Sequence, residues 1–279
     1  MSSKQFSRFL GTIGAAATLF ATPAFASGGR QGGPQSPVFD LSRGRSVLDT
    51  IDAKEASTYS FDSKADSLSW DKYKGVAEKA TGFHIVVSLQ DKHLWAIIGE
   101  DTVLSAPVAV AKGTTLKGPN KQTYVFKTPR GVRTVLRKEA DPIWQPPEWL
   151  YVETALEYGL KIGHLGNKSR IKLDNGRILT MKDGQAGIID AGVFDTLPTD
   201  EHIVFGDTLF VPPLGSKNRK VEGELGKFRL DMGEGFLLHG TPYKESIGMA
   251  ATHGCVRMRD EDIEWLYDHI PVGTKVYIY

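Results

Sequence analysis

The chain carries the stretch Phe236-Leu-Leu-His-Gly-Thr241 and, shortly after it, Thr252-His-Gly-Cys-Val-Arg-Met258. Residues 227–231 and 236–239 are rich in apolar residues, and Met232-Gly-Glu-Gly235 between them has the composition of a turn. This pattern predicts two neighbouring strands, the second of which ends at a histidine. The cysteine-containing stretch then leads directly into a predicted C-terminal helix.

That C-terminal helix is predicted from its start, its apolar face and its end. Asp260 is of a residue type that caps helix starts, and Pro271 ends the helix. Between them an apolar face recurs at i, i+3, i+4 and i+7, formed by Ile263, Leu266, Tyr267 and Ile270. Residues 275–279 alternate as a final strand does.

Most of the chain after residue 83 has the pattern of short strands separated by turns. Two short helices are also predicted, one around 70–80 that Gly82 ends and one over 152–160. The predicted strands cover 84–89, 94–98, 103–111, 121–127 and 132–137, the first three as a meander. The predicted fold class is therefore mainly β, a sandwich or barrel with a few peripheral helices.

The composition allows a sizeable core and argues against some partners. Of the 279 residues 41% are hydrophobic, and Lys plus Arg number 34 against 33 Asp plus Glu. A formal net charge of +1 argues against a protein that binds nucleic acid by neutralising phosphates. The sequence has no phosphate loop, nucleotide fingerprint or second cysteine for a thiolate cluster, so we expect no cofactor and no metal.

The N-terminus has the pattern of a secretory signal peptide. Lys4 and Arg8 precede an uncharged run over 9–26 that ends in Ala24-Phe25-Ala26, a sequence typical of a cleavage site. A membrane anchor is the alternative, but the run is rich in Gly, Ala and Thr and contains Pro23. We predict that the mature chain is exported to the periplasm or cell envelope.

Composition divides the chain into three parts. A signal peptide at 1–26 is followed by a linker and N-terminal extension at 27–82, of which 27–37 is dominated by Gly, Pro, Ser and Gln. One folded domain is predicted over 83–279. Within it the prolines and aromatic residues of 138–210 favour an insertion or a lid over the cleft.

Cys255 is the single cysteine of the chain. In an exported protein such a thiol is buried and inert, paired with another chain, or reactive. Two histidines and an arginine lie within 239–257, and this company favours a reactive thiol over a structural one. The remaining histidines have no such company and are expected to be surface or satisfied polar residues: His84, His93, His164, His202 and His269.

The pattern predicts which groups do the chemistry. A thiol with an unperturbed pKa of about 8.5 needs a base or an electropositive setting to become a nucleophile. His253 is too close along the chain to be a good proton shuttle, whereas His239 arrives from another strand. We therefore predict Cys255 as nucleophile and His239 as base. The amides of Gly254 and Cys255 are candidates for an oxyanion hole, and Arg257 offers a forked cation to a carboxylate.

These residues resemble the signature of the L,D-transpeptidase (YkuD-like) catalytic domain. The resemblance covers about 83–279, with high specificity at the C-terminal end and little through 138–210. The motifs that carry it are His239-Gly-Thr241, Ile247-Gly248, Thr252-His-Gly-Cys-Val-Arg-Met258, residues 271–278, the opening hairpin at 85–95 and the turn Lys127-Thr-Pro-Arg-Gly131.

The resemblance implies an extracytoplasmic enzyme that acts on bacterial cell-wall peptides. By position, Cys255 would attack the carbonyl between the third, L-centre residue and the D-alanine of a peptidoglycan tetrapeptide stem. A thioacyl-enzyme would form, and an amine of another stem or of a wall-anchored protein would take the acyl group.

The resemblance also implies roles for the neighbouring residues. His239 would be oriented by the Gly240 carbonyl, and His253 and Gly254 would line the oxyanion hole with the cysteine amide. The expected substrate-binding residues are Arg257, Thr252 and Thr241; Thr252 stands where serine is commoner in the family.

Two alternatives follow from the same residues. Water as the acceptor would make the protein an L,D-carboxypeptidase or a hydrolase that uses the same nucleophile. An inactive wall-binding module is the second alternative, and the joint presence of Cys255, His239, Gly254 and Arg257 argues against it. The pattern indicates no oligomeric state.

Overall fold

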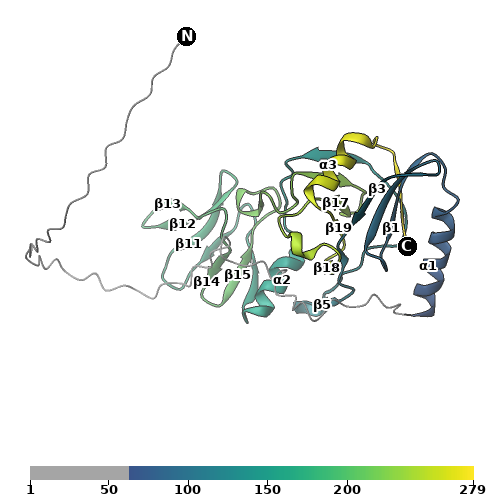
Figure 1. Ribbon diagram of the computed structural model, residues 1–279. Coiled ribbons are helices and arrows are strands. Elements are labelled where there is room, and N and C mark those ends of the chain that lie inside the picture. Colours follow the sequence, from purple (N-terminus) through teal and green to yellow (C-terminus); the bar gives the residue numbers. More distant parts are fainter. Residues whose placement is uncertain (1–62) are drawn as a thin grey trace, which may run out of the picture. The chain divides into compact units, whose positions relative to one another are not determined.

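The computed structural model describes residues 63–279, so the predicted signal peptide and the linker at 27–37 lie outside the described residues. Within 63–279 strands predominate, accompanied by three α-helices (Figure 1). The predicted mainly β fold with a few peripheral helices is confirmed. The described helices are all too short or too polar to span a bilayer.

The first sheet has five strands in the order β3-β2-β1-β20-β7. β1 pairs antiparallel with β2 and parallel with the C-terminal β20, so the predicted meander is confirmed and the last strand lies inside the sheet. Ile85, Val87, Val276 and Ile278 are completely buried because they point to the core side of the pleat. The bounds are β1 Phe83–Ser88, β2 His93–Ile98, β3 Asp101–Pro107, β7 Gly131–Thr134 and β20 Lys275–Ile278.

The second sheet has four strands in the order β19-β17-β16-β8. Its bounds are β8 Arg137–Ala140, β16 Phe228–Asp231, β17 Leu237–His239 and β19 Val256–Arg257. Leu230, Leu238 and Val256 belong to the same hydrophobic cluster as the buried residues of the first sheet. The domain is therefore a sandwich, because both sheets bury one face in one core.

Helix α3, Asp260–His269, closes this core from the side of β16 and β17. Ile263 and Leu266, on its predicted apolar face, are fully buried, and Pro271 follows the helix as expected. The predicted capping role of Asp260 is wrong: Arg259 is the N-cap and makes no side-chain bond there. Asp260 is instead the first helical residue, and its Oδ1 accepts from the Thr241 amide at 3.2 Å. The carboxylate thus ties the helix to the segment after β17.

Helix α1, Lys64–Ala77, begins earlier than the predicted 70–80 because Ser63 caps it, accepting from the Asp66 amide at 3.2 Å. Its first turns are polar, which hides them from an apolar periodicity. The helix packs on β20 through Trp70, whose ring lies edge-on to that of Tyr279 at 5.8 Å, and Asp66 pairs with Arg130.

Between β8 and β16 lies an inserted segment, which we define as residues 142–221. Hydrogen bonds join Trp144 and Val221 in both directions at 2.8 and 2.9 Å, so the chain enters and leaves side by side. The segment has hydrophobic clusters of its own, one around Leu179 and one around Leu209. Residues 138–140 of the predicted 138–210 stretch belong to β8 and pair with β16 in the second sheet.

The inserted segment contains one helix and two small sheets. Helix α2 begins at Glu148, four residues before the predicted start at 152, because Pro147 precedes it and proline suits a helix start. It lies against β9 and β15. The bounds are α2 Glu148–Glu157, β9 Lys161–His164, β10 Arg170–Lys172, β11 Ile178–Lys182, β12 Gln185–Asp190, β13 Val193–Thr196, β14 Ile203–Phe205, β15 Thr208–Val211 and η4 Lys217–Arg219.

Short elements complete the domain near the cysteine. β18 pairs parallel with β4, which brings the segment before Cys255 beside the end of the first meander. The predicted strand at 121–127 is only three residues long, since a 3₁₀ turn precedes it. The bounds are β4 Val110–Ala111, β5 Thr115–Lys117, η3 Pro119–Lys121, β6 Thr123–Val125, η5 Lys244–Ser246 and β18 Ala250–Thr252.

A close backbone contact beneath the end of β17 generates a stability prediction. Gly226 has φ +65, and a Cβ there would lie 2.5 Å from the Gly240 carbonyl carbon, whereas Gly223 with φ +77 has nothing within 4 Å. Gly223→Ala should lower the free energy of unfolding by about 1–2 kcal/mol through its left-handed backbone. Gly226→Ala should cost about 1–3 kcal/mol more through overpacking. Denaturant titration of both variants checks this, and equal losses would contradict it.

Candidate active site

The parallel pair β17 and β19 places the predicted nucleophile and base. Leu238 lies opposite Val256 and His239 opposite Arg257. Leu238 and Val256 point into the core, so their neighbours along each strand point to the other face of the sheet. Cys255, two residues before Arg257, therefore shares that outer face with His239. The structure thus places His239 at the end of β17 and Cys255 directly before the adjacent strand β19.

His239 is locked by the backbone of its own neighbour. Its side chain is buried, and Nδ1 lies 2.6 Å from the Gly240 carbonyl oxygen, as the predicted orienting contact requires. Because a carbonyl only accepts, Nδ1 carries the proton and Nε2 is the basic nitrogen. Burial, together with the positive charge of Arg257, lowers the pKa of His239 to about 3, although the Gly240 bond opposes this. The imidazole is therefore neutral at physiological pH.

Cys255 is a free thiol that is partly buried. Sγ lies 3.7 Å from the Gly235 carbonyl oxygen. Burial raises the pKa of Cys255 to about 11, while a backbone hydrogen bond from Leu237 and the charge of Arg257 act in the opposite direction. At rest the thiol and the imidazole are thus both neutral, and they do not form a thiolate–imidazolium pair.

The turn before the nucleophile is held by Thr252. Its Oγ1 donates to the Cys255 carbonyl at 2.6 Å and accepts from the Gly254 amide at 3.3 Å. Gly254 has φ +152, and a Cβ there would lie 3.1 Å from the Phe236 ring. Only glycine suits this position without displacing the ring. The Gly254 amide, predicted for an oxyanion hole, is directed at the threonine hydroxyl in this structure.

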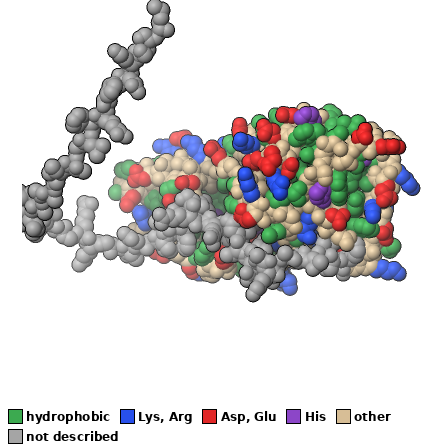
Figure 2. Space-filling model, in the orientation of Figure 1, with side chains coloured by type: hydrophobic (Ala, Val, Ile, Leu, Met, Phe, Trp, Pro, Cys, Tyr) green, Lys and Arg blue, Asp and Glu red, His purple; other side chains and the backbone are tan. Residues whose placement is uncertain are grey.

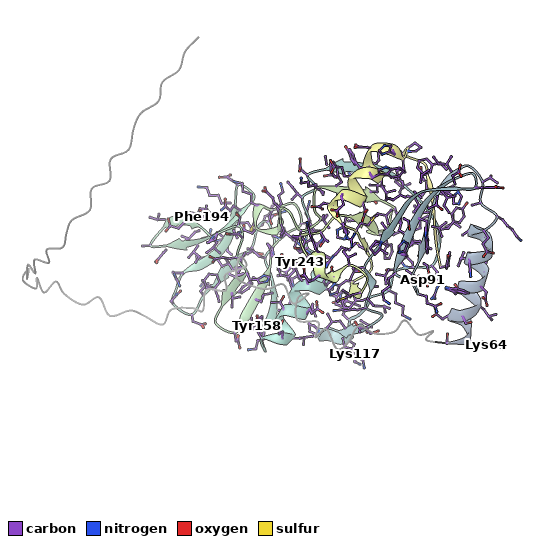
Figure 3. All side chains as sticks on the ribbon, in the orientation of Figure 1. Lys64, Asp91, Lys117, Tyr158, Phe194 and Tyr243 are labelled. Atoms are coloured by element: carbon purple, nitrogen blue, oxygen red, sulfur yellow. The ribbon has the colours of Figure 1, made fainter. Side chains whose placement is uncertain are left out.

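Arg257 is buried beside the site. Its Nη1 donates to Ser246 Oγ at 3.0 Å, and the guanidinium lies 5.3 Å from the ring centre of Tyr243, which Figure 3 labels. Its charge acts on both reactive groups, since it contributes to lowering the pKa of His239 and opposes the rise at Cys255. Its predicted contact with a substrate carboxylate stays a prediction.

The two threonines predicted to bind substrate lie inside the protein. Thr241 is completely buried, and its hydroxyl accepts from the Tyr243 amide at 3.0 Å. Thr252 is 3% exposed, and its hydroxyl is used within its own turn. Both side chains support loops of the site in this structure, because their polar groups are turned inward.

His253 is surrounded by residues of other elements, of which sequence reasoning missed Glu153, Lys112 and Phe126; Trp149 belongs to the aromatic residues expected to form a lid. Its Nε2 lies 3.0 Å from Glu153 Oε2, and Glu153 Oε1 accepts from Lys112 Nζ at 2.9 Å. The imidazole stacks on Trp149 with ring centres 4.0 Å apart and meets the edge of Phe126 at 4.4 Å. Trp149 and Glu153 are four residues apart on α2, so the sequence could have shown that they share one helix face. Nothing in the sequence connects that face to a residue 100 positions away.

Four of the other histidines have polar partners, whereas His202 packs edge-on against the ring of Tyr151 with ring centres 5.7 Å apart. His84 is buried with Nδ1 2.9 Å from the Gly82 oxygen, and His93 Nε2 lies 2.8 Å from Ser105 Oγ. Among the described residues, no three His, Cys, Asp or Glu side chains are grouped to hold a metal ion. Acidic and basic side chains are intermixed on the face drawn in Figure 2.

A cavity of about 530 Å³ lies where the inserted segment joins the second sheet. Asp141, Glu222 and Asp260 line it, together with Gly226. Neither Cys255 nor His239 is among its lining residues. The cavity therefore lies next to Gly226 and Asp260, which pack under the end of β17, and not next to the thiol.

Cys255 and His239 share the outer face of the second sheet, and Arg257 lies opposite His239 in the pairing of β17 with β19. A thiol and an imidazole on one face are the side chains that a cysteine-dependent acyl transfer would use. Comparison with known proteins places the chain in a family. The family model of the L,D-transpeptidase catalytic domain (YkuD) matches residues 82–278. The chain belongs to this family.

Individual relatives match over shorter stretches. A stretch of 66 residues is 41% identical to "Probable L,D-transpeptidase YbiS" of Escherichia coli strain K12, covering 24% of this chain and 20% of that protein. Another of 57 residues is 39% identical to "Probable L,D-transpeptidase ErfK/SrfK" of Salmonella typhimurium, covering 20% and 18%. The matched stretches thus span about a fifth of these relatives.

A solved structure is similar to a larger share of the chain. It is the catalytic domain of the E. faecium L,D-transpeptidase acylated by ertapenem. The match covers 72% of this chain and 98% of that one, with 14% identity and a TM-score of 0.36.

The low pKa of His239 generates a prediction for stability against pH. Between about pH 6.5 and pH 3 the unfolded histidine binds a proton that the folded one does not, so stability falls as pH falls through this window. The slope contributed is at most about 1.4 kcal/mol per pH unit. His239→Gln should remove this contribution to the slope, which is measured as the free energy of unfolding from pH 6 down to pH 4. The matched control is His269→Gln at an exposed position. Equal slopes for wild type and His239→Gln would contradict the prediction.

Proposed function

We propose that the chain is a peptidoglycan L,D-transpeptidase in which Cys255 is the nucleophile and His239 the general base. The observation that carries the proposal is the tautomer of His239. Because Nδ1 donates to the Gly240 carbonyl, the basic Nε2 is the nitrogen left for the reaction, on the face of the sheet that carries the thiol. This is the orientation that a base for Cys255 requires.

The resting protonation states define the first step. As Sγ attacks the carbonyl between the L-centre residue and the D-alanine of a tetrapeptide stem, the thiol proton passes to His239 Nε2. The carbon–nitrogen bond then breaks, the amine of D-alanine takes that proton, and a thioester remains on Cys255. Because the imidazole starts neutral and the thiol starts protonated, the thiol has to give up its proton to the imidazole in the course of this step.

An amine acceptor completes the cycle. It attacks the thioester carbonyl, loses a proton to the now neutral His239, and releases the thiol with a new amide bond. The acceptor we propose is the side-chain amine of another stem or of a wall-anchored protein. Arg257 is proposed to fix a stem carboxylate, and the Cys255 amide with the His253–Gly254 turn to hold the oxyanion.

The remaining proposals follow from the family and the N-terminal pattern. We propose a catalytic domain over 83–279 behind a cleaved signal peptide, working in the periplasm or cell envelope without a cofactor. Thr252 and Thr241 are assigned to the support of the two loops, because their hydroxyls are bound within the chain.

The first test is the product formed from disaccharide tetrapeptides. Purified protein should yield a cross-linked dimer of the mass expected for loss of one D-alanine, read by mass spectrometry. Cys255→Ala, checked for folding by circular dichroism, should yield no product. A trimmed tripeptide alone would replace the transferase by an L,D-carboxypeptidase, and the absence of both products would refute the proposal.

The second test separates the roles of the two histidines. Ertapenem, which acylates the E. faecium domain, is the probe, and the adduct mass reports acylation of Cys255. His239→Ala should slow acylation at pH 7 by about 10²- to 10⁴-fold, the usual contribution of a general base. His253→Ala should slow it less. Cys255→Ala must form no adduct, and a larger loss at His253 than at His239 would reverse the assignment.

A further inference from the structure

His253, which directly follows β18, is held by side chains from other elements of the chain. Its side chain is 7% exposed and that of Glu153 is 14% exposed, so their 3.0 Å contact lies largely away from water. One face of the imidazole is covered by Trp149, with an angle of 16° between the rings. Phe126 closes a second side edge-on. The ring therefore has one orientation, which the surrounding residues determine.

Two of these contacts belong to the inserted segment. Trp149 and Glu153 project from the same face of α2, because they are four residues apart on a helix. One supplies a flat apolar surface and the other a carboxylate. We propose that Glu153 is a positioning residue for His253, and that the inserted segment thereby completes the active site. This inference rests on the proposed function only for its effect on catalysis.

The contact determines which imidazole nitrogen carries the proton. An ionised carboxylate accepts hydrogen bonds only, so His253 Nε2 donates and Nδ1 is left as an acceptor. Burial alone would raise the pKa of Glu153, but the hydrogen bonds from His253 and Lys112 outweigh it and lower that pKa below its usual value. Glu153 is therefore ionised at neutral pH.

Lys112 links the same carboxylate to the turn of the nucleophile. Its backbone amide donates to the Thr252 carbonyl at 2.8 Å, directly before His253. Its ammonium donates to Glu153. A chain of contacts thus runs from α2 through Glu153 to His253 and, by way of Lys112, to Thr252. The charged groups that act on His253 are Glu153 from α2, Lys112 after β4 and Arg257 on β19.

Loss of the carboxylate should release this arrangement. Without it, Lys112 faces the imidazole with no intervening negative charge, and Nε2 loses its acceptor. The tautomer of His253 then becomes mixed, and the turn that carries Cys255 loses one of its supports. Catalysis should fall although Glu153 touches neither the thiol nor the substrate.

The test uses the full chain and two readouts. Nitrogen-15 NMR of the His253 ring should show the Nε2–H tautomer in wild type, a mixture of tautomers in Glu153→Ala, and a lower titration midpoint in Glu153→Gln, which keeps an acceptor but no charge. Acylation by ertapenem should slow about 10- to 100-fold in Glu153→Ala, the loss common when an imidazole loses a carboxylate partner. Glu153→Gln should recover part of that rate. Glu157→Gln, exposed on the same helix, is the matched control.

A double variant shows whether Glu153 acts through His253. In the His253→Ala background, Glu153→Ala should cause no further loss of acylation rate. Additive losses, or an unchanged His253 tautomer in Glu153→Ala, would overturn the inference. If wild type itself forms no ertapenem adduct, the proposed function fails, and the NMR readout still decides the placement of His253 by Glu153.

Discussion

The parallel pairing of β17 with β19 fixes the positions of the candidate site residues relative to the hydrophobic core. Leu238 and Val256 lie opposite each other and are completely buried, and the alternation of side chains along a strand then determines the direction of His239, Cys255 and Arg257. A slip of one residue in β19 would turn Cys255 into the core and expose Val256, and the same slip in β17 would do this to His239 and Leu238. Burial of these apolar side chains thus keeps the candidate reactive groups in register before any substrate binds.

The same burial sets the protonation states of the site. It lowers the pKa of His239 and raises that of Cys255, so both groups rest uncharged. A protonated thiol reacts slowly with oxidants and stray electrophiles, because the thiolate is the reactive form. For a lone cysteine, a neutral resting state offers protection at the expense of intrinsic reactivity.

Sequence alone could predict most strands of the sandwich and the C-terminal helix, because each depends on short-range patterns, whereas the roles of Cys255 and His239 stay predictions. It failed where a contact joins distant segments. Asp260 has the residue type of a cap, yet its carboxylate accepts from Thr241, since the helix packs against the end of β17. Helix α1 was missed in its first turns because they are polar and are fixed by the Ser63 cap. Glu153 and Lys112 were missed because their partner His253 is determined by the tertiary fold.

The inserted segment has clusters of its own, yet it enters and leaves the sandwich through a narrow antiparallel passage at β8 and β16. Because the two connecting strands alone do not fix its position, the placement of the inserted segment depends on the contacts that it makes with the sandwich. The contacts of Trp149 and Glu153 with His253 are of this kind: one stacks, the other hydrogen-bonds, and both act on the residue two positions before the nucleophile. The two side chains that would orient the turn before Cys255 thus also hold the inserted segment against the sandwich. It follows that the inserted segment can differ widely in sequence while the sandwich stays constant, provided that one helix face presents an acceptor and a flat apolar surface to the turn.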